Sequence, residues 1–219
     1  IKEQIDFTFV GPELPLVKGI VDEFQKHNLK IFGPTKHAAD LEGSKAFSKK
    51  FMLENGVRTA KAEIFDSYVL AKEYVQTQKY PLVVKASGLA AGKGVVICED
   101  VEQAEATLRQ FMIDKIFGDA GIKVVIEQFL KGFEASVIAF WNGKKAFPCV
   151  SAKDYKKIGN GDTGLNTGGM GTVAPSPEFT AEHLADFEKN ILEPTVKGIK
   201  DNTLNFVGFI FFGVLVENN

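Results

Sequence analysis

The stretch from residue 84 to residue 94, V-K-A-S-G-L-A-A-G-K-G, decides more about the fold than any other part of the chain. An apolar strand, P-L-V-V at residues 81–84, runs into Lys85. The nine residues that follow contain three glycines, three alanines and a second lysine, Lys93. Small residues allow backbone N–H groups to approach an anion closely, and two ammonium groups supply the opposite charge. The stretch therefore predicts a cradle for a polyphosphate.

This cradle differs from a Walker A loop, which has four residues between its glycines and a hydroxyl residue after its lysine. Here three residues separate Gly88 from Gly92, and Gly94 follows Lys93. A second predicted strand, residues 95–98, comes after the loop, where a Walker A loop would open a helix. We therefore expect a loop between two strands to cover the phosphates. A purely structural glycine-rich hairpin is the alternative, and the flanking lysines favour phosphate binding.

Length and composition place the chain among soluble globular proteins. Its 219 residues allow one large domain or two modest ones, and 45% hydrophobic with 25% charged residues is ordinary. A net charge of −2 gives no reason to expect nucleic acid or an anionic membrane surface. The longest apolar run, residues 206–216, is too short to span a bilayer. We expect Cys98 and Cys149, which lie in apolar runs outside any CxxC, to be buried, reduced thiols.

The two ends of the chain carry no targeting signal. The first residues, I-K-E-Q-I-D, lack the apolar segment of a signal peptide, and no methionine opens the chain. We therefore expect a cytoplasmic protein whose sequence is shortened at both ends.

Apolar periodicity predicts an α/β architecture that begins with a parallel βαβ unit. Its strands are residues 5–10 and 29–32, and its helix runs from residue 15 to about residue 27. Further predicted helices cover 41–55, 66–78, 101–111 (with a capping box from Asp100 to Gln103) and 180–200, the last interrupted at Pro194. Further predicted strands cover 123–129 and 206–216, and 134–140 forms a hairpin with 145–150 around Asn142-Gly143.

Residues 151–178 show no apolar periodicity, so we expect a long loop. Its core, G-N-G-D-T-G-L-N-T-G-G-M-G-T, has six glycines from Gly159 to Gly171. Long loops inside compact domains are usually functional or disordered. The aspartate, asparagine and threonine side chains favour a binding role, whereas the glycines alone would also fit a linker.

Six stretches, in this order and spacing, resemble the phosphoribosylamine–glycine ligase family, also called glycinamide ribonucleotide synthetase, of the ATP-grasp superfamily. The resemblance covers about residues 5–216, and N-T-G-G-M-G together with L-A-A-G-K-G separates this family from most other ATP-grasp enzymes. The stretches are V-G-P-E-L-P-L-V-K-G (10–19), G-P-T-K-H-A-A-D-L-E-G-S-K-A-F (33–47), V-V-K-A-S-G-L-A-A-G-K-G-V (83–95), F-G-D-A-G (117–121), V-I-E-Q-F-L-K-G-F-E-A-S (125–136) and N-T-G-G-M-G (166–171).

The resemblance implies a mixed α/β and α+β fold. Residues 1–42 would be the C-terminal part of a Rossmann-like N-terminal domain, and residues 43–219 an incomplete ATP-grasp domain. Within the latter, a lid subdomain would span about residues 60–130 and a central subdomain about residues 131–219.

The resemblance also assigns the site residues. Lys45 and Lys85 would reach the α- or β-phosphate of ATP, residues 87–94 would cover the phosphates, and residues 127–130 would meet the adenine edge. Glu134 would bind the ribose hydroxyls. The implied ATP-binding residues are Lys45, Lys85, Ser87, Gly88, Gly92, Lys93, Gly94, Glu127, Phe129, Leu130 and Glu134. Those implied for phosphoribosylamine and glycine are Gly11, Pro12, Glu13, Asp162, Thr163, Gly164, Asn166, Thr167, Gly168 and Gly169. Those implied to be catalytic are Lys85, Asp162 and Asn166.

The implied reaction uses ATP as a substrate, with Mg²⁺ or Mn²⁺. The carboxylate of glycine would attack the γ-phosphate of ATP, and the amine of 5-phosphoribosylamine would then attack the resulting acyl phosphate. Positioning and charge neutralisation would carry this chemistry, under a lid that excludes water. The metal-binding motif of the family is absent, so we expect the metal ligands beyond Asn219 and interpret residues 217–219 as a hairpin turn. The alternative is that Glu217 and Asn219, which have the Glu-x-Asn spacing of the motif, are the metal ligands.

Several alternatives remain open. Without the motif, Lys45, with Lys49 and Lys50 nearby, would be a solvated charge. Ser87 has no identifiable base, and His27, His37 and His183 show no metal spacing, so we expect them at the surface or in helix caps. Another ATP-grasp carboxylate–amine ligase and a nucleotide-binding fragment without activity are the competing functions. We expect small-molecule partners only, with no nucleic acid or membrane, and a monomer.

Overall fold

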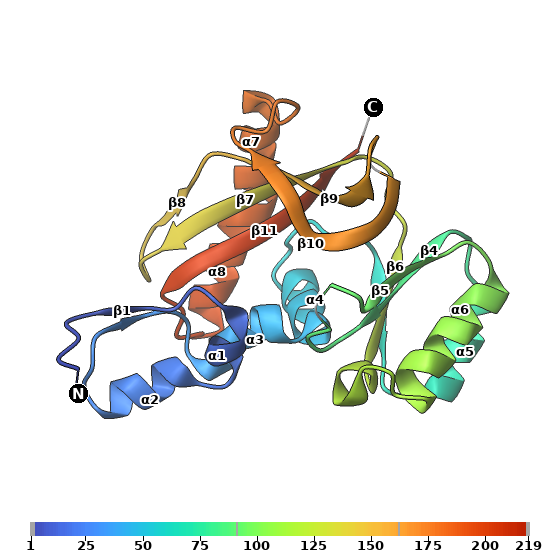
Figure 1. The fold of residues 1–219 in the computed structure, drawn as a ribbon, viewed down its shortest axis with the longest axis horizontal. Coiled ribbons are helices and arrows are strands. Elements are labelled where there is room, and N and C mark those ends of the chain that lie inside the picture. The colour runs from blue at the N-terminus through green and yellow to red at the C-terminus, as the bar shows by residue number, and fades with distance from the viewer. Residues whose placement is uncertain (1–2, 91, 162, 218–219) are drawn as a thin grey trace. The chain divides into compact units, whose positions relative to one another are not determined.

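The computed structural model describes residues 3–90, 92–161 and 163–217 (Figure 1). The chain forms two compact units. Unit 1 contains the residues up to Asp40, Asn55–Val57 and the residues from Lys131 onward. Unit 2 contains Leu41–Glu54 and Arg58–Leu130. The chain therefore enters unit 2 at Leu41, returns to unit 1 for Asn55–Val57, and returns to it again at Lys131.

Unit 2 is built on a four-stranded antiparallel sheet in the order β3-β6-β4-β5. The strands are β3 (Ala62–Phe65), β4 (Leu82–Ala86), β5 (Val95–Cys98) and β6 (Val124–Gln128). Helices α5 (Tyr68–Val75) and α6 (Val101–Leu108) lie side by side in this unit (Figure 1). They share a buried core with alternate residues of the central strands, such as Val84 and Ile126. The prediction that β4 and β5 flank the glycine-rich loop is confirmed.

The two helices of this core begin at side-chain caps. Ser67 accepts a hydrogen bond from the N–H of Leu70, and Asp100 accepts one from the N–H of Gln103. The predicted capping box is only half formed, because the Gln103 side chain accepts the N–H of Glu99 instead of that of the cap. Helix α6 continues into the π-helical turn η1 (Arg109–Ile113), and the 3₁₀ turn η2 (Gly118–Gly121) precedes β6.

The helix predicted over residues 41–55 is wrong in its bounds. The structure has two helices, α3 (Lys36–Gly43) and α4 (Lys45–Glu54). They meet at Ser44, whose hydroxyl accepts the N–H of Phe47 at 3.2 Å. A serine hydroxyl in this position satisfies a free donor at a helix start, so α4 begins anew here.

Unit 1 begins with the predicted parallel pair, shortened to β1 (Thr8–Phe9) and β2 (Ile31–Phe32). The single helix predicted from residue 15 to about residue 27 is two helices, α1 (Glu13–Val17) and α2 (Ile20–Lys26). The break falls at Gly19, whose φ of +88° is left-handed and suits a residue without a Cβ.

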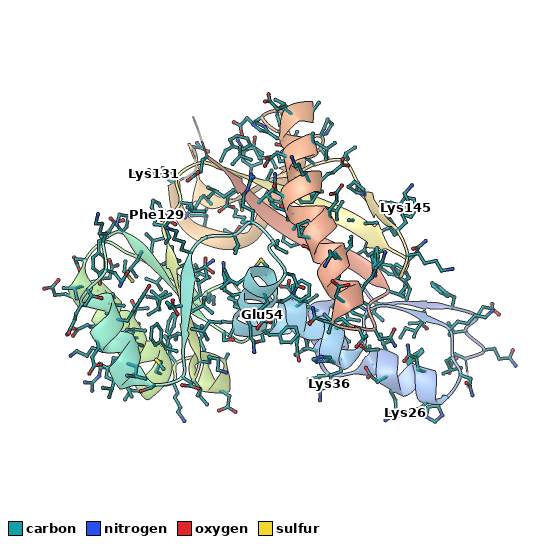
Figure 2. All side chains as sticks on the ribbon, turned by 180° about the vertical axis from the view of Figure 1, so that it is seen from behind. Lys26, Lys36, Glu54, Phe129, Lys131 and Lys145 are labelled. Carbon is teal, nitrogen blue, oxygen red and sulfur yellow. The ribbon has the colours of Figure 1, made fainter. Side chains whose placement is uncertain are left out.

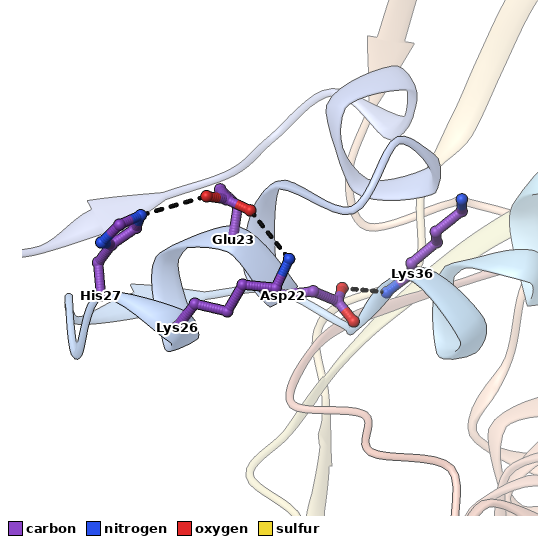
Figure 3. Close-up of polar contacts among 5 residues, drawn as sticks. All are labelled: Asp22, Glu23, Lys26, His27 and Lys36. Atoms are coloured by element: carbon purple, nitrogen blue, oxygen red, sulfur yellow. Dashed lines mark hydrogen bonds and ion pairs between the residues drawn. The ribbon is translucent and has the colours of Figure 1, made fainter.

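An open groove lies beside these two helices. Its lining residues are Leu14, Pro15, Lys18, Gly19, Ile20, Asp22, Glu23, Lys26 and Lys36. Several of its charges are already paired: Glu23 contacts Lys26 at 3.1 Å and His27 at 3.2 Å, and Asp22 accepts the backbone N–H of Lys36 (Figure 3). Ion pairs between exposed side chains are screened by water and contribute little to stability. We therefore interpret this face as a solvated surface.

The main sheet of unit 1 has the order β11-β7-β8 and is antiparallel. Its strands are β7 (Phe133–Trp141), β8 (Ala146–Pro148) and β11 (Gly208–Val216). The predicted hairpin turn at Asn142-Gly143 is confirmed, because the Asn142 side chain accepts the N–H groups of Lys144 and Lys145. The rings of Phe9 and Phe32 contact Phe209, which joins the parallel pair to this sheet.

The long helix predicted over residues 180–200 is confirmed, but the interruption predicted at Pro194 is wrong, because the helix runs on through that residue after a π-helical turn that ends at Leu192. It consists of α7 (Ala181–Phe187), η3 (Glu188–Leu192) and α8 (Glu193–Asp201). Pro194 lies in the first turn of α8, where a missing N–H is tolerated. The three histidines lie in caps or at the surface, as predicted: His27 ends α2, His183 completes a capping box, and His37 is exposed.

The long loop predicted over residues 151–178 is wrong. The structure has a two-stranded antiparallel hairpin, β9 (Lys153–Gly159) and β10 (Thr163–Val173). Its register shifts twice, between Thr163 and Asn166 and again before Gly171. Bulges and glycines remove the period-two apolar pattern by which a strand is recognised. The two strands of this hairpin could therefore not be predicted from the sequence.

The two cysteines differ, and the prediction for Cys149 is wrong. Cys98 is fully buried, which raises the pKa of its thiol. Cys149 is exposed because it follows β8, the edge strand of its sheet. Across the described residues, no helix is both long and apolar enough to cross a membrane.

Candidate functional site

The candidate site in unit 2 starts from the face of the sheet opposite to α5 and α6. Lys85 pairs with Val125 across β4 and β6, and Glu127 pairs with Val83. Residues two positions apart on a strand share a face, so Lys85 and Glu127 project from the same side as diagonal neighbours. The alternation that buries Val84 in the core thus places a lysine and a glutamate on the other face.

The Glu127 carboxylate holds two lysines, one on each oxygen. Lys85 Nζ lies 2.6 Å from Oε2, and Lys49 Nζ lies 3.1 Å from Oε1. Lys49 comes from α4 and is 3% exposed. Burial lowers the pKa of Lys49, and the attraction of Glu127 opposes that shift. The Glu127 carboxylate therefore neutralises part of a larger positive charge.

Lys45 extends this charge toward the glycine-rich loop. Its Nζ donates to the carbonyl of Gly88 at 3.2 Å. The pKa of Lys45 is lowered, mainly by burial. The negative charge of Glu42 opposes this shift, and the positive charge of Lys85 adds to it. In the part of the chain that the structure describes, three ammonium groups thus face the carboxylates of Glu127 and Glu42. This surplus of positive charge suits an anion.

The first residues of the glycine-rich loop are fastened to the start of α4. The N–H of Lys45 donates to the carbonyl of Ser87 at 2.7 Å, and the Ser87 hydroxyl accepts the N–H of Ala46 at 3.1 Å. Ser87 and Gly88 use their own N–H groups on the carbonyls of Lys123 and Ala120. These two amides are therefore structural, and the phosphate-covering role that we predict falls on the loop beyond them.

The described residues further along the loop differ in exposure. Gly92 has a φ of +76° and, like Lys93, is exposed, whereas Gly94 is buried and accepts the N–H of Ala86. A Cβ at Gly94 would come within 2.7 Å of Ala90. A side chain at this point would force the neighbouring residues apart, so the return of the loop to β5 requires glycine.

The predicted adenine-binding segment, residues 127–130, begins with the last two residues of β6. Phe129 and Leu130 are half-buried and lie outside any strand, and the chain passes from unit 2 to unit 1 between Leu130 and Lys131 (Figure 2). Glu127, the first residue of this segment, is committed to its two lysines. Contact between its carboxylate and adenine stays a prediction.

The residues predicted for phosphoribosylamine and glycine belong to unit 1. Gly11, Pro12 and Glu13 are exposed where α1 begins. Thr163, Gly164, Gly168 and Gly169 are exposed on β10, and Thr167 donates to the carbonyl of Lys156 across the hairpin. Asp162 and the side chain of Asn166 lie outside the described residues, so their roles stay predictions.

Asp154 is a polar centre in unit 1 that the sequence did not reveal. Its two carboxylate oxygens accept hydrogen bonds from Ser136, at 2.6 Å, and Thr172, at 2.8 Å. The hydrogen bond from Ser136 is the largest cause that lowers the pKa of Asp154, followed by the hydrogen bond from Thr172.

Glu134, on the same face of β7 as Ser136, has a 70% exposed side chain that reaches Lys156 at 3.5 Å. An exposed Glu134 can reach a ligand hydroxyl.

We predict that Ser136→Ala raises the pKa of Asp154 toward its ordinary value, and that Thr172→Val does so less. A carboxylate with a depressed folded-state pKa stabilises the fold above its unfolded pKa, and this contribution fades as pH falls through the folded-state value. Carboxyl titration by NMR is the measurement, with thermal unfolding between neutral and acidic pH beside it. An unchanged Asp154 pKa in Ser136→Ala would contradict the assignment.

Among the described residues, no group of three or more histidine, cysteine, aspartate or glutamate side chains is placed to hold a metal ion. Glu217 is exposed just past β11, and Asn219 lies outside the described residues, so our interpretation of 217–219 as a turn stays a prediction.

Comparison with known protein families identifies the family of this chain. Residues 43–219 match the model of the phosphoribosylglycinamide synthetase ATP-grasp (A) domain, and residues 1–42 match that of the phosphoribosylglycinamide synthetase N domain. The chain belongs to the phosphoribosylglycinamide synthetase family. This membership confirms the resemblance and the ATP-grasp fold that we predicted from the sequence.

Curated relatives and solved structures agree with this family. The phosphoribosylamine–glycine ligase of Fusobacterium nucleatum is 55% identical over 100% of this chain and 51% of its own length. That of Clostridium acetobutylicum is 52% identical over 98% of this chain and 52% of its own length. The crystal structure of the Thermotoga maritima ligase matches with a TM-score of 0.84 at 32% identity, over 98% of this chain and 52% of that one. The chain thus spans about half the length of the curated relatives that it matches.

A more distant structure shows the fold alone. The D-alanine–D-alanine ligase of Bacillus anthracis matches with a TM-score of 0.69 at 19% identity, over 99% of this chain and 67% of that one. Of the predicted ATP-binding residues, this structure brings together five, which are Lys45, Lys85, Ser87, Gly88 and Glu127. Lys49, one helical turn after Lys45, lies beside these residues and contacts Glu127, but it is not part of the predicted ATP-binding set.

Proposed function

We propose that the protein is an ATP-dependent ligase that joins glycine to 5-phosphoribosylamine and forms glycinamide ribonucleotide, ADP and phosphate. One observation carries the nucleotide part of this proposal. Lys45, from a helix, and Lys85, from a strand, place their ammonium groups at the start of the glycine-rich loop. The carboxylate of Glu127, which contacts Lys85, also contacts Lys49. The names of the curated relatives support the choice of glycine and phosphoribosylamine.

In this proposal, Lys45 and Lys85 bind the phosphate oxygens of ATP and withdraw charge as the γ-phosphoryl group is transferred. The carboxylate of glycine attacks the γ-phosphorus, the bond to the β-phosphate oxygen breaks, and ADP leaves. The amine of phosphoribosylamine then attacks the acyl carbon, phosphate departs and the amine loses a proton. Such chemistry depends on orientation and on preorganised charge more than on a protein nucleophile.

The loop 89–93 would close over the phosphates, and the exposed residues of β10 and of the start of α1 would bind the two other substrates. Mg²⁺ or Mn²⁺ is expected to accompany ATP, with protein ligands outside the described residues. We place the protein in the cytoplasm as a monomer with small-molecule partners. The net charge of −2 supports the absence of a nucleic-acid partner.

The test is phosphate release by the intact protein with ATP, Mg²⁺, glycine and phosphoribosylamine. We expect multiple turnovers only when both glycine and phosphoribosylamine are present. Turnover with a different carboxylate–amine pair would assign another ATP-grasp reaction. Nucleotide binding without turnover under any pairing would leave only the binding module.

A further inference from the structure

Lys49 is held in place more completely than a solvated helix lysine would be. Its ammonium group donates to Thr59 Oγ1 at 2.5 Å and to the Ala60 carbonyl at 3.3 Å, and it lies 3.1 Å from Glu127 Oε1. An ammonium group has three N–H donors. All three are therefore used by protein oxygens, and Lys49 has no donor left for a ligand.

Lys85 differs from Lys49 in the respects that matter for ligand binding. Its side chain is 27% exposed, against 4% for that of Lys49. Of the hydrogen bonds that the structure describes, Lys85 Nζ makes one, to Glu127 Oε2. Two donors and an open side remain for an incoming anion. The two lysines also use different oxygens of Glu127, so one can leave without displacing the other.

We propose that Lys49 is a positioning residue that stays on Glu127 and thereby frees Lys85 to move to the phosphates of a nucleotide. The inference rests on the nucleotide site proposed above and adds a residue that does not touch the nucleotide. An unpaired carboxylate in a buried setting is costly. If Lys85 were the sole counter-ion of Glu127, its move to a phosphate would incur that cost. With Lys49 in place, the Glu127 carboxylate remains paired.

The fold explains why these roles divide between two neighbouring lysines. Lys45 and Lys49 are four residues apart on α4, so their side chains lie on one face of the helix. Lys45 is at the first turn, where α4 is fastened to Ser87 of the glycine-rich loop. Lys49 is one turn further along and reaches the middle of the sheet face. The same helix face thus supplies a phosphate ligand and the counter-ion that keeps Lys85 available.

The test compares Lys49→Met with Lys50→Met in the intact protein. Lys50 is the adjacent residue of α4, but it is exposed and contacts Glu54. Calorimetric titration with a non-hydrolysable ATP analogue and with adenosine is the measurement. We expect Lys49→Met to weaken analogue binding by about tenfold and to leave adenosine binding within about twofold. Lys50→Met should change neither, and Lys49→Arg, which keeps the charge, should restore most of the analogue affinity.

A double variant separates positioning from plain structural support. In a Glu127→Gln background, no carboxylate remains to retain Lys85, so adding Lys49→Met should leave analogue affinity within about twofold. An equal loss of analogue and adenosine binding in Lys49→Met, no loss of either, or an undiminished loss in the Glu127→Gln background would overturn the inference. Lys85→Met tests the site itself: if it does not weaken analogue binding, the proposed nucleotide site fails. If Lys85→Met weakens binding and Lys49→Met does not, the inference alone fails.

Discussion

Replacing Lys85 with alanine is expected to weaken binding of a non-hydrolysable ATP analogue by about ten- to a hundredfold. A hydrogen bond between an ammonium and a phosphate is worth about 1.5–3 kcal/mol, and each 1.4 kcal/mol is about tenfold in affinity. Lys45→Ala should have a similar or smaller effect on affinity. Lys45 Nζ already donates a hydrogen bond to the Gly88 carbonyl, so fewer of its donors are available to the phosphates. Calorimetric titration measures both variants.

Lys50→Ala is the matched control for this experiment. It removes a lysine from the same helix whose exposed side chain lies 3.8 Å from Glu54. Its analogue affinity should stay within about twofold of the unaltered protein. Unchanged affinity in both Lys85→Ala and Lys45→Ala would remove the observation on which the proposed function stands.

The strands around the site could be predicted because their sequences carry the pattern that their environment demands. Leu82, Val84 and Ala86 alternate with residues of the opposite face, and the buried run of β6 follows the same logic. Lysine at position 85 stands out in such a run because the interior rarely accepts an unpaired charge. Apolar runs therefore predicted these strands, and the lysine at the end of one of them marked Lys85 as a candidate ligand.

Helix boundaries were harder to predict because they depend on single backbone and side-chain contacts. The break at Gly19 comes from one left-handed residue, and the break at Ser44 comes from one hydroxyl that accepts the N–H of Phe47. Neither event interrupts the apolar periodicity of the surrounding sequence. A pattern averaged over several turns therefore runs through both.

The partners of Lys49 and Asp154 could not be predicted, since both depend on contacts between segments far apart in the chain. A lysine in a helix with other lysines nearby is usually solvated, and only the packing of α4 against β6 brings Lys49 to Glu127. Asp154 contacts Ser136 and Thr172 only when β9 and β10 form their hairpin beside β7. The one local hint was spacing: Lys49 follows Lys45 by four residues.

Replacing Glu127 with alanine is expected to lower the free energy of unfolding by about 3–5 kcal/mol, the usual cost of removing one partner from a buried ion pair. Glu127 is the carboxylate that both Lys49 and Lys85 contact, and the side chain of Lys49 is 4% exposed. Urea unfolding measures the change. Glu54→Ala, which removes an exposed glutamate from α4, is the control and should stay within about 0.5 kcal/mol.

The destabilisation in Glu127→Ala should shrink as pH rises, and this dependence identifies its cause. Without the carboxylate, nothing opposes the burial that already lowers the pKa of Lys49, so its folded-state pKa falls further below the unfolded value. Between those two pKa values the unfolded state binds more protons than the folded state, so stability increases with pH across that window. A loss of packing alone would be the same at neutral and alkaline pH. A pH-independent destabilisation would therefore show that Glu127 acts through its shape and not through the charge it neutralises.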